Sequence, residues 1–286
     1  MKYRAVVAFF SLIRCVGHFL FLTLSQICEF IFYSQQLIPK TRMKLNKKAL
    51  LAFAVASLFG MSAYATPGDG DGDKNDLTKE NVQPTLADYF SPVSKNVAKP
   101  DAKGFIRRWL LLEPIDKPNR SNTVFTDSYI RENFGQQYFP GQFTDVPTDG
   151  KTEKVGEQEL KWHAFDATRY NVKLFRFASG LEKQVYGVLF WAVTIIDCPE
   201  DISNVRLAVG SNSASMWWLN GEEAVILSGD RRMVVDDVMS GRLNLKKGKN
   251  VLRGAVINGP GMSDFCVRFI KENGEPLTNV SVTLTK

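Results

Sequence analysis

Histidine is nearly absent from this sequence of 286 residues, which contains only His18 and His163. A serine-type hydrolase needs a base beside its nucleophile, and zinc sites need clustered His and Cys ligands. The His and Cys residues show no metal-ligand spacing here, and no Gly-x-Ser-x-Gly segment marks a nucleophile elbow. The sequence therefore argues against catalysis and indicates no cofactor.

Cysteine is also scarce. Of four cysteines, Cys15 and Cys28 lie near the start of the chain, which leaves Cys198 and Cys266 for the rest. These two are able to pair in an oxidising compartment, although their spacing does not show that they do. With at most one disulfide there, the fold has to rest on an apolar core, and the 221 residues after Ala65 are enough to form one.

Residues 43–65 have the composition of a secretory signal peptide. A basic stretch ending at Lys48 precedes the 13 apolar residues Ala49–Met61, and the small-residue site Ala63-Tyr64-Ala65 follows. We expect cleavage after Ala65 and a secreted or periplasmic protein. Residues 1–42 are then expected to be an upstream extension that precedes the true start, with a membrane segment as the alternative.

The positive charge is concentrated in this leader region. The chain has a net charge of +6, but residues 1–65 carry 8 of its 36 Lys and Arg and 1 of its 30 Asp and Glu. The remainder has 28 basic and 29 acidic residues, a net charge of −1. It lacks the basic surface that nucleic-acid binding requires, so we expect no nucleic-acid partner.

Residues 66–103 are rich in Gly, Asp, Lys, Pro and Asn and predict a flexible linker. Four acidic side chains within them fall at positions 1, 3, 5 and 12 of a calcium loop: Asp69, Asp71, Asp73 and Glu80. Lys74 stands where such a loop needs glycine for its turn. A solvated acidic linker is therefore the preferred interpretation, with weak calcium binding as the alternative.

From Gly104 onward, short runs rich in Val, Ile, Phe and Trp alternate with turn residues. The expected strands are Phe105–Leu112, Asn171–Phe177, Gln184–Asp197, Asn204–Gly210, Ser215–Leu219, Glu223–Leu227, Arg242–Leu245, Val251–Asn258, Phe265–Ile270 and Val280–Leu284. Many short strands at this spacing predict an all-β antiparallel sandwich over residues 104–286. Residues 113–165 are less regular, and we expect long loops there and a short helix at Asp127–Phe134.

Asn220-Gly221 predicts a two-residue hairpin, because both residues tolerate positive φ and both flanking runs are strand-like. Neighbouring residues of a strand point to opposite faces. Trp217 and Trp218, side by side in the first strand, therefore cannot both be buried on one side.

Three segments together resemble a known family: Arg108–Pro114, Trp217–Gly221 and Leu245–Asn250. They are similar to the opening strand, the Trp-x-Asn-Gly hairpin and the Leu-x-x-Gly-x-Asn motif of the galactose-binding-like jelly roll. That domain occurs as a sugar-binding domain of glycoside hydrolases and as an accessory module of secreted bacterial proteins. Glu113 replaces the glycine of the family's opening strand.

The resemblance covers about residues 104–286 and implies a jelly-roll β-sandwich. It implies that Trp217 and Leu219 point inward and Trp218 outward, where an indole can stack on a sugar ring. Some similar chains carry the label acetyl xylan esterase, so the resemblance also brings that activity as a rival hypothesis.

Paired donors and acceptors follow the hairpin. Arg231, Arg232 and Asp236 can hydrogen-bond vicinal sugar hydroxyls, and with Trp218 they form the expected ligand-binding set. The alternative is a surface ion-pair loop, which contributes little to stability.

The leading hypothesis is a secreted or periplasmic, non-catalytic carbohydrate-binding module that assists polysaccharide degradation; the glycan is not identified. The first alternative is a carbohydrate esterase of the acetyl xylan type, with Ser263 and His163 as its least implausible catalytic residues, although no histidine follows residue 163. The second alternative is a structural or interaction module with a secreted protein partner.

Overall fold

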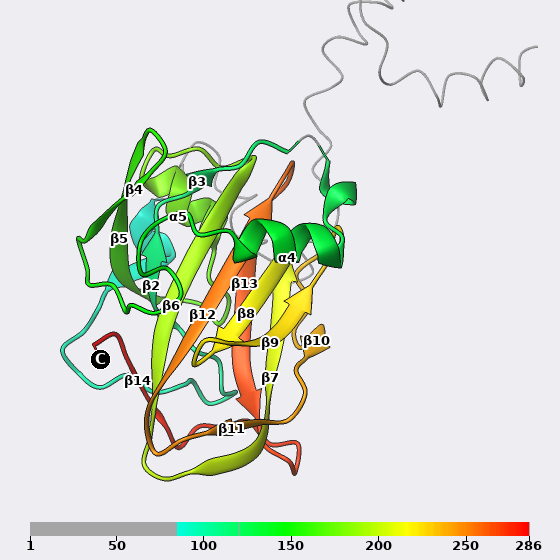
Figure 1. The fold of residues 1–286 in the computed structure, drawn as a ribbon. Coiled ribbons are helices and arrows are strands. Elements are labelled where there is room, and N and C mark those ends of the chain that lie inside the picture. The colour runs from blue at the N-terminus through cyan, green and yellow to red at the C-terminus, as the bar shows by residue number, and fades with distance from the viewer. Residues whose placement is uncertain (1–84, 120, 286) are drawn as a thin grey trace, which may run out of the picture. The chain divides into compact units, whose positions relative to one another are not determined.

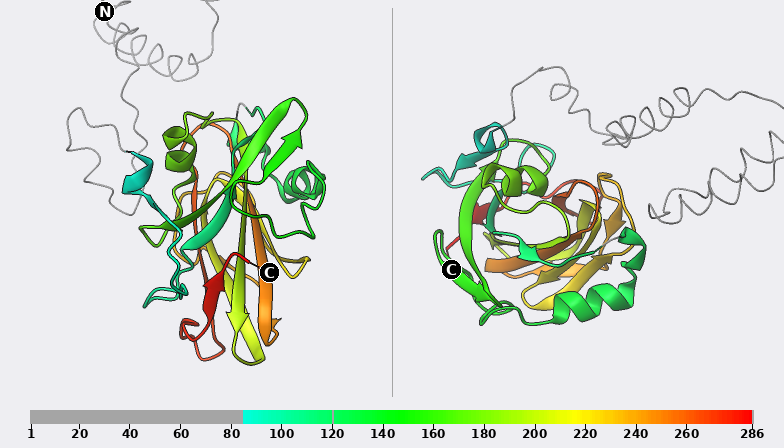
Figure 2. Two further views of the ribbon diagram at one scale, coloured as in Figure 1. Left: turned by 90° about the vertical axis from the view of Figure 1, so that its left-hand side faces the viewer. Right: turned by 90° about the horizontal axis from the view of Figure 1, so that it is seen from above.

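The computed structural model describes residues 85–119 and 121–285. In this part of the chain every strand pairing is antiparallel, and two sheets pack face to face around an apolar core (Figures 1 and 2). The predicted all-β antiparallel sandwich is therefore confirmed. The leader, the signal peptide and the four acidic residues of the calcium-loop pattern lie outside the described residues, as do Cys15 and Cys28.

The larger sheet has ten strands: β1 (Phe90–Pro92), β2 (Arg108–Leu112), β3 (Ile115–Asp116), β4 (Thr152–Val155), β5 (Gln158–Ala167), β6 (Val188–Cys198), β8 (Ala214–Leu219), β9 (Glu222–Leu227), β12 (Gly248–Asn258) and β14 (Ser281–Thr283). Its main order is β1-β5-β2-β6-β12-β8-β9, with β3 and β14 paired to β6 and β4 paired to β5. The strand expected at Gln184–Asp197 is β6, nearly all of which is buried.

The smaller sheet has four strands: β7 (Ile202–Asn212), β10 (Val238–Met239), β11 (Leu243–Leu245) and β13 (Asp264–Ile270). All three other strands pair with β7. Val205, Leu207 and Val209 of β7 belong to the core between the sheets. The intervening residues of β7 therefore point to the outer face of this sheet.

Helix α4 (Asp127–Gly135) confirms the helix expected at Asp127–Phe134. The Thr126 side chain caps its start by accepting a hydrogen bond from the Tyr129 backbone N–H. Ile130 and Phe134 are buried in an apolar cluster on the outer face of the larger sheet, over which Figure 1 shows the helix lying.

The strand predicted at Asn171–Phe177 is wrong, because helix α5 (Leu174–Gly180) occupies much of it. Leu174, Phe177 and Ala178 are buried on one side of this helix, at the i, i+3, i+4 spacing of an apolar helix face. In so short a run the helical and strand patterns are hard to distinguish.

The long loops expected over residues 113–165 are also partly wrong, because β4 and β5 form a hairpin there. Gly156 at its turn has a φ of 58°, and Glu153 and Val155 are buried while their neighbours in β4 are exposed. The charged Glu153 at a buried position obscures the strand pattern of β4 in the sequence.

The flexible linker predicted for residues 66–103 extends too far in the part that the structure describes. Two short elements precede residue 103: the 3-10 turn η1 (Leu86–Asp88) and β1, which pairs with β5. Tyr89 and Phe90 are buried in the main core, and Ala98 forms a bridge to Val282. The segment of residues 85–103 is therefore held to the sandwich at Tyr89, Phe90 and Ala98, while most of its other residues are exposed.

The hairpin predicted at Asn220-Gly221 is confirmed, with φ values of 53° and 93° at these two residues. The Asn220 side chain joins two of the three segments that carry the family resemblance, the Trp217–Gly221 hairpin and the Leu245–Asn250 motif. Its Nδ2 donates to Oδ1 of Asn250 at 3.0 Å, and its Oδ1 accepts from the Val251 backbone N–H at 2.8 Å. These local bonds do not establish the jelly-roll connectivity, which remains a prediction.

Aromatic side chains fill two apolar layers. The first lies between the sheets, where the rings of Trp109, Trp217 and Phe265 meet edge to face. The second lies on the outer face of the larger sheet, beneath α4 and the loop of residues 136–150. Among the described residues, no helix is long and apolar enough to cross a membrane.

Cys198 and Cys266 are buried and are not bonded to each other. Burial raises the pKa of the Cys198 thiol to about 11 and that of Cys266 to about 12, so neither forms a thiolate near neutral pH. We expect Ellman's reagent at pH 8 to leave both thiols unmodified in the folded protein and to label both in guanidinium chloride. Peptide mapping by mass spectrometry identifies the modified residues, and rapid labelling of either one in the native state would contradict this prediction.

Candidate functional site

The two candidate catalytic residues do not form a pair. His163 lies in β5 rather than in the loop expected for it, and its Nε2 is 3.1 Å from Oε1 of Glu113. The Ser263 hydroxyl is buried and has no hydrogen-bond partner among the described residues. Because base and hydroxyl are not hydrogen-bonded to each other, this structure does not provide an activated serine.

Glu113, next to His163, is the most perturbed carboxyl group of this region. Its side chain is buried, and its Oε2 lies 3.0 Å from Nζ of Lys183. Burial raises the pKa of Glu113. The hydrogen bonds from Lys183 and His163 lower it by more than burial raises it, so the pKa lies below its usual value. The group is held as a carboxylate by its partners.

Trp218 does not present an open platform for stacking on a sugar. As expected, Trp217 and Trp218 lie on opposite faces of β8, with Trp217 and Leu219 in the main core. The Trp218 side is covered, however: its indole stacks on Trp191 with ring centroids 5.5 Å apart, and Phe143 packs edge-on against it. Trp218 thus points to the outer face as expected, but it is only 6% exposed, because the loop of residues 136–150 buries it.

The other three predicted ligand-binding residues lie in one segment but have separate partners. Asp236 makes a bidentate pair with Arg268 of β13, whereas Arg231 pairs with Asp237. Arg232 is exposed. Since Arg268 lies on the outer face of the smaller sheet and Trp218 on that of the larger one, the structure does not bring Trp218 and Asp236 together.

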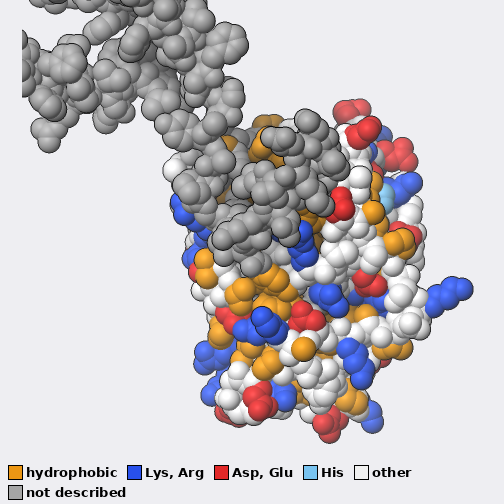
Figure 3. All heavy atoms as spheres, turned by 180° about the vertical axis from the view of Figure 1, so that it is seen from behind, with side chains coloured by type: hydrophobic (Ala, Val, Ile, Leu, Met, Phe, Trp, Pro, Cys, Tyr) orange, Lys and Arg blue, Asp and Glu red, His pale blue; other side chains and the backbone are white. Residues whose placement is uncertain are grey.

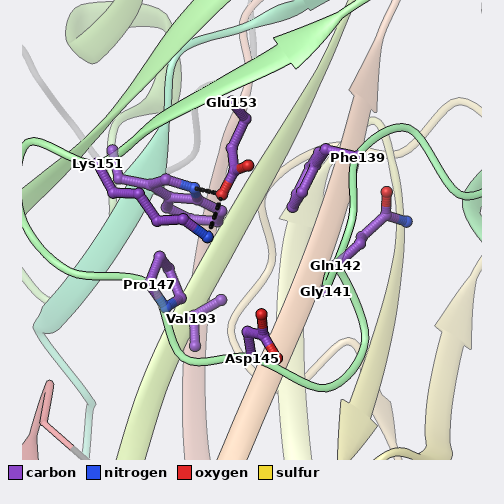
Figure 4. A pocket seen from close by; sticks show the side chains of 9 residues that line it. Phe139, Gly141, Gln142, Asp145, Pro147, Lys151, Glu153 and Val193 are labelled. Carbon is purple, nitrogen blue, oxygen red and sulfur yellow. Dashed lines mark hydrogen bonds and ion pairs between the residues drawn. The ribbon is translucent and has the colours of Figure 1, made fainter.

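A small hollow lies beneath the loop of residues 136–150, where Glu153 accepts hydrogen bonds from Trp162 Nε1 and Lys151 Nζ (Figure 4). Its free volume is about 10 Å³. This is the size of one water molecule, so a sugar ring does not fit. Arg253 is buried nearby, with one N–H on the Asp145 carbonyl and its Nε unpartnered among the described residues.

A larger hollow of about 320 Å³ lies on the outer face of the smaller sheet, and we call it the outer groove. It is lined by Asn204, Arg206, Asp236, Met239, Arg242, Arg268, Ile270, Lys271, Glu272 and Gly274. Figure 3 views the molecule from behind, where basic, acidic and apolar side chains lie close together. Of the predicted ligand-binding residues, only Asp236 lines this groove.

Strand register explains how the outer groove arises. Ala208 of β7 is the register partner of both Met239 in β10 and Arg268 in β13, so two long side chains flank a short one. Asp236 has a φ of 56°, a conformation that Asp tolerates better than most residues, and this turn places its carboxylate on Arg268. Arg268 also donates to the Lys103 carbonyl at 2.8 Å, which fixes its guanidinium.

Three arginines of the groove were absent from the predicted site: Arg206, Arg242 and Arg268. Arg206 stands between the core residues Val205 and Leu207, and Arg268 between Val267 and Phe269. This alternation places both arginines on an outer face, but it does not show that a groove forms there. Among the described residues, no cluster of His, Cys, Asp and Glu has the make-up of a metal site.

Searches with the sequence found no matching family model and no matching curated protein. Solved structures with some likeness include a PA14 sugar-binding domain from an RTX adhesin, with 8% identity and a TM-score of 0.38 over 61% of this chain and 96% of that one. The PA14 domain of the antifreeze protein MpAFP has 10% identity and a TM-score of 0.38, covering 66% and 96%. A β-glucosidase from Kluyveromyces marxianus in complex with glucose has 22% identity and a TM-score of 0.30, covering 43% of this chain and 16% of that one.

Proposed function

We propose that the protein is a non-catalytic carbohydrate-binding module whose outer groove binds a sugar. The observation that carries the proposal is the groove itself: planar polar side chains converge there beside the apolar Met239 and Ile270. Its volume of about 320 Å³ lies at the lower end of the range for ligand pockets, which suits one or two sugar rings.

The chemistry of the groove walls suits a sugar. Beyond the bonds that they make to each other, the Arg268 guanidinium keeps N–H donors and the Asp236 carboxylate keeps lone pairs that sugar hydroxyls can use, and Asn204 adds an amide group. The C–H face of a sugar ring can lie against Met239, which is 41% exposed. Together with the predicted signal peptide, this supports a secreted or periplasmic module that assists polysaccharide breakdown.

A glycan array with the full chain tests the proposal. We expect wild-type protein to bind at least one glycan, and Asp236→Asn to weaken that binding about tenfold because the carboxylate acceptor is lost. Asparagine tolerates the positive φ at residue 236, so the turn is retained. Arg231→Lys is the matched control, because Arg231 belongs to the same segment but does not line the groove.

Two results would contradict the proposal. One is the absence of binding to every glycan, and the other is binding that Asp236→Asn leaves unchanged. Loss of binding in Arg231→Lys with retention in Asp236→Asn would place the site elsewhere on the segment of residues 228–239.

A further inference from the structure

Resting on the proposed function, we infer that the glycan bound in the outer groove carries carboxylate groups, as a uronic acid does, and that Arg206 binds them. The inference depends on the balance of charge within the groove, on the position of Arg206 and on the shape of its guanidinium group.

The outer groove has more positive than negative side chains. It is lined by four basic residues, Arg206, Arg242, Arg268 and Lys271, and by two acidic ones, Asp236 and Glu272. Asp236 pairs with Arg268 and Glu272 with Arg242, while Lys271 pairs with Glu275 beside the groove. Among the described residues, Arg206 therefore supplies the charge that no ion pair compensates.

The Arg206 side chain is exposed and makes no hydrogen bond or ion pair within the described residues. Its strand position directs it to the outer face, because Val205 and Leu207 on either side point into the core. Its register partner is Ile270, and Arg268 stands opposite Ala208, two residues further along β7. The free guanidinium thus lies on the same face as the Arg268–Asp236 pair, beside an apolar side chain.

A guanidinium group matches a planar carboxylate with two parallel hydrogen bonds, which a neutral hydroxyl cannot reproduce. The paired Arg268 and Asp236 remain suited to hydroxyls, and Ile270 and Met239 to the ring face. Since residues 66–286 carry a net charge of −1, the local excess in the groove is not part of a generally basic surface. This pattern fits an acidic sugar better than a nucleic acid.

The test compares acidic polysaccharides with neutral counterparts of the same backbone. Binding of the full chain is measured by affinity electrophoresis and calorimetry with polygalacturonate, alginate and chondroitin sulfate, each against a neutral counterpart with its carboxyl groups esterified or reduced and its sulfates removed. We expect at least one acidic member to bind about tenfold or more tightly than its neutral counterpart. Single-stranded DNA serves as a polyanion without sugar carboxylates.

Three variants assign the effect to Arg206. Arg206→Ala should remove the preference for the acidic glycan, and Arg206→Lys should retain only part of it, because an ammonium group lacks the planar fork. Lys154→Ala is the control: Lys154 is exposed on β4 of the other sheet, and its side chain makes no hydrogen bond or ion pair in the described part of the chain.

Each outcome decides between the two proposals. Equal binding of acidic and neutral glycans, or unchanged binding in Arg206→Ala, would overturn the inference and leave the proposed function standing. Equal binding of DNA would overturn it in favour of a general polyanion surface. Failure to bind every glycan, neutral ones included, would remove the proposed function and the inference together.

Discussion

Gly254→Ala is expected to lower the free energy of unfolding by about 3 kcal/mol, the upper end of the range for overpacked cores. A Cβ at this position would lie 2.3–2.6 Å from three ring carbons of Trp217. For a domain of this size, the loss corresponds to a decrease in Tm of about 6–12 °C, measurable by calorimetry or near-UV circular dichroism.

The indole of Trp217 cannot move aside easily. Its Nε1 donates to the Ser215 hydroxyl at 3.0 Å, and its ring packs against Trp109 and Phe265 with centroids 5.9 and 5.0 Å away. Gly254 lies in β12 directly opposite Trp217 in the register, so a shift of either strand would disturb the centre of the larger sheet.

Two further variants make this prediction specific. Gly241→Ala is the matched control, since a Cβ there meets no atom within 4 Å, and its Tm should stay within a few degrees of wild type. Gly254→Ala should cost less in a Trp217→Phe background, because the smaller ring leaves room for the methyl group. Two results would contradict the packing described: an unchanged Tm in Gly254→Ala, or a decrease in Tm on adding Gly254→Ala to Trp217→Phe that is as large as in the wild-type background.

Glu113→Gln is expected to lower the free energy of unfolding by about 2 kcal/mol at pH 7, because charge-assisted bonds to Lys183 and His163 are replaced by weaker ones. The effect should depend on pH. The pKa of Glu113 is lowered below 4.5 in the folded protein, so its contribution is complete above that pH and is lost as the pH falls through the folded pKa.

Urea unfolding between pH 3 and pH 7 measures this difference. The gap between wild type and Glu113→Gln should be widest at pH 6–7 and should shrink below pH 4.5. Glu159→Gln is the control, because the Glu159 side chain lies exposed in β5 and makes no hydrogen bond or ion pair within the described residues, and this variant should follow wild type throughout. A gap that stays constant with pH would show that the Glu113 carboxylate is not stabilised by its partners.

Local patterns in the sequence predicted much of the secondary structure. The strand at Phe265–Ile270, the Asn220-Gly221 turn and the helix after Thr126 each depend on residues close together in the chain, and each prediction is confirmed. The pattern failed at α5, where a short apolar run fits either periodicity. It also failed before residue 103, where pairing of β1 with β5 joins residues about 75 positions apart.

The sequence by itself determined the antiparallel sandwich and the opposite orientation of Trp217 and Trp218, because the alternation of side chains along a strand is a local property. Only the tertiary structure decided that Trp218 is covered and that Asp236 meets Arg268 beside Arg206, whose side chain has no ion pair in the part of the chain that the structure describes. Which face of a sheet is covered depends on where distant segments fold back over it. The candidate site therefore lies on the outer face of the smaller sheet, and Trp218 of the hairpin is not part of it.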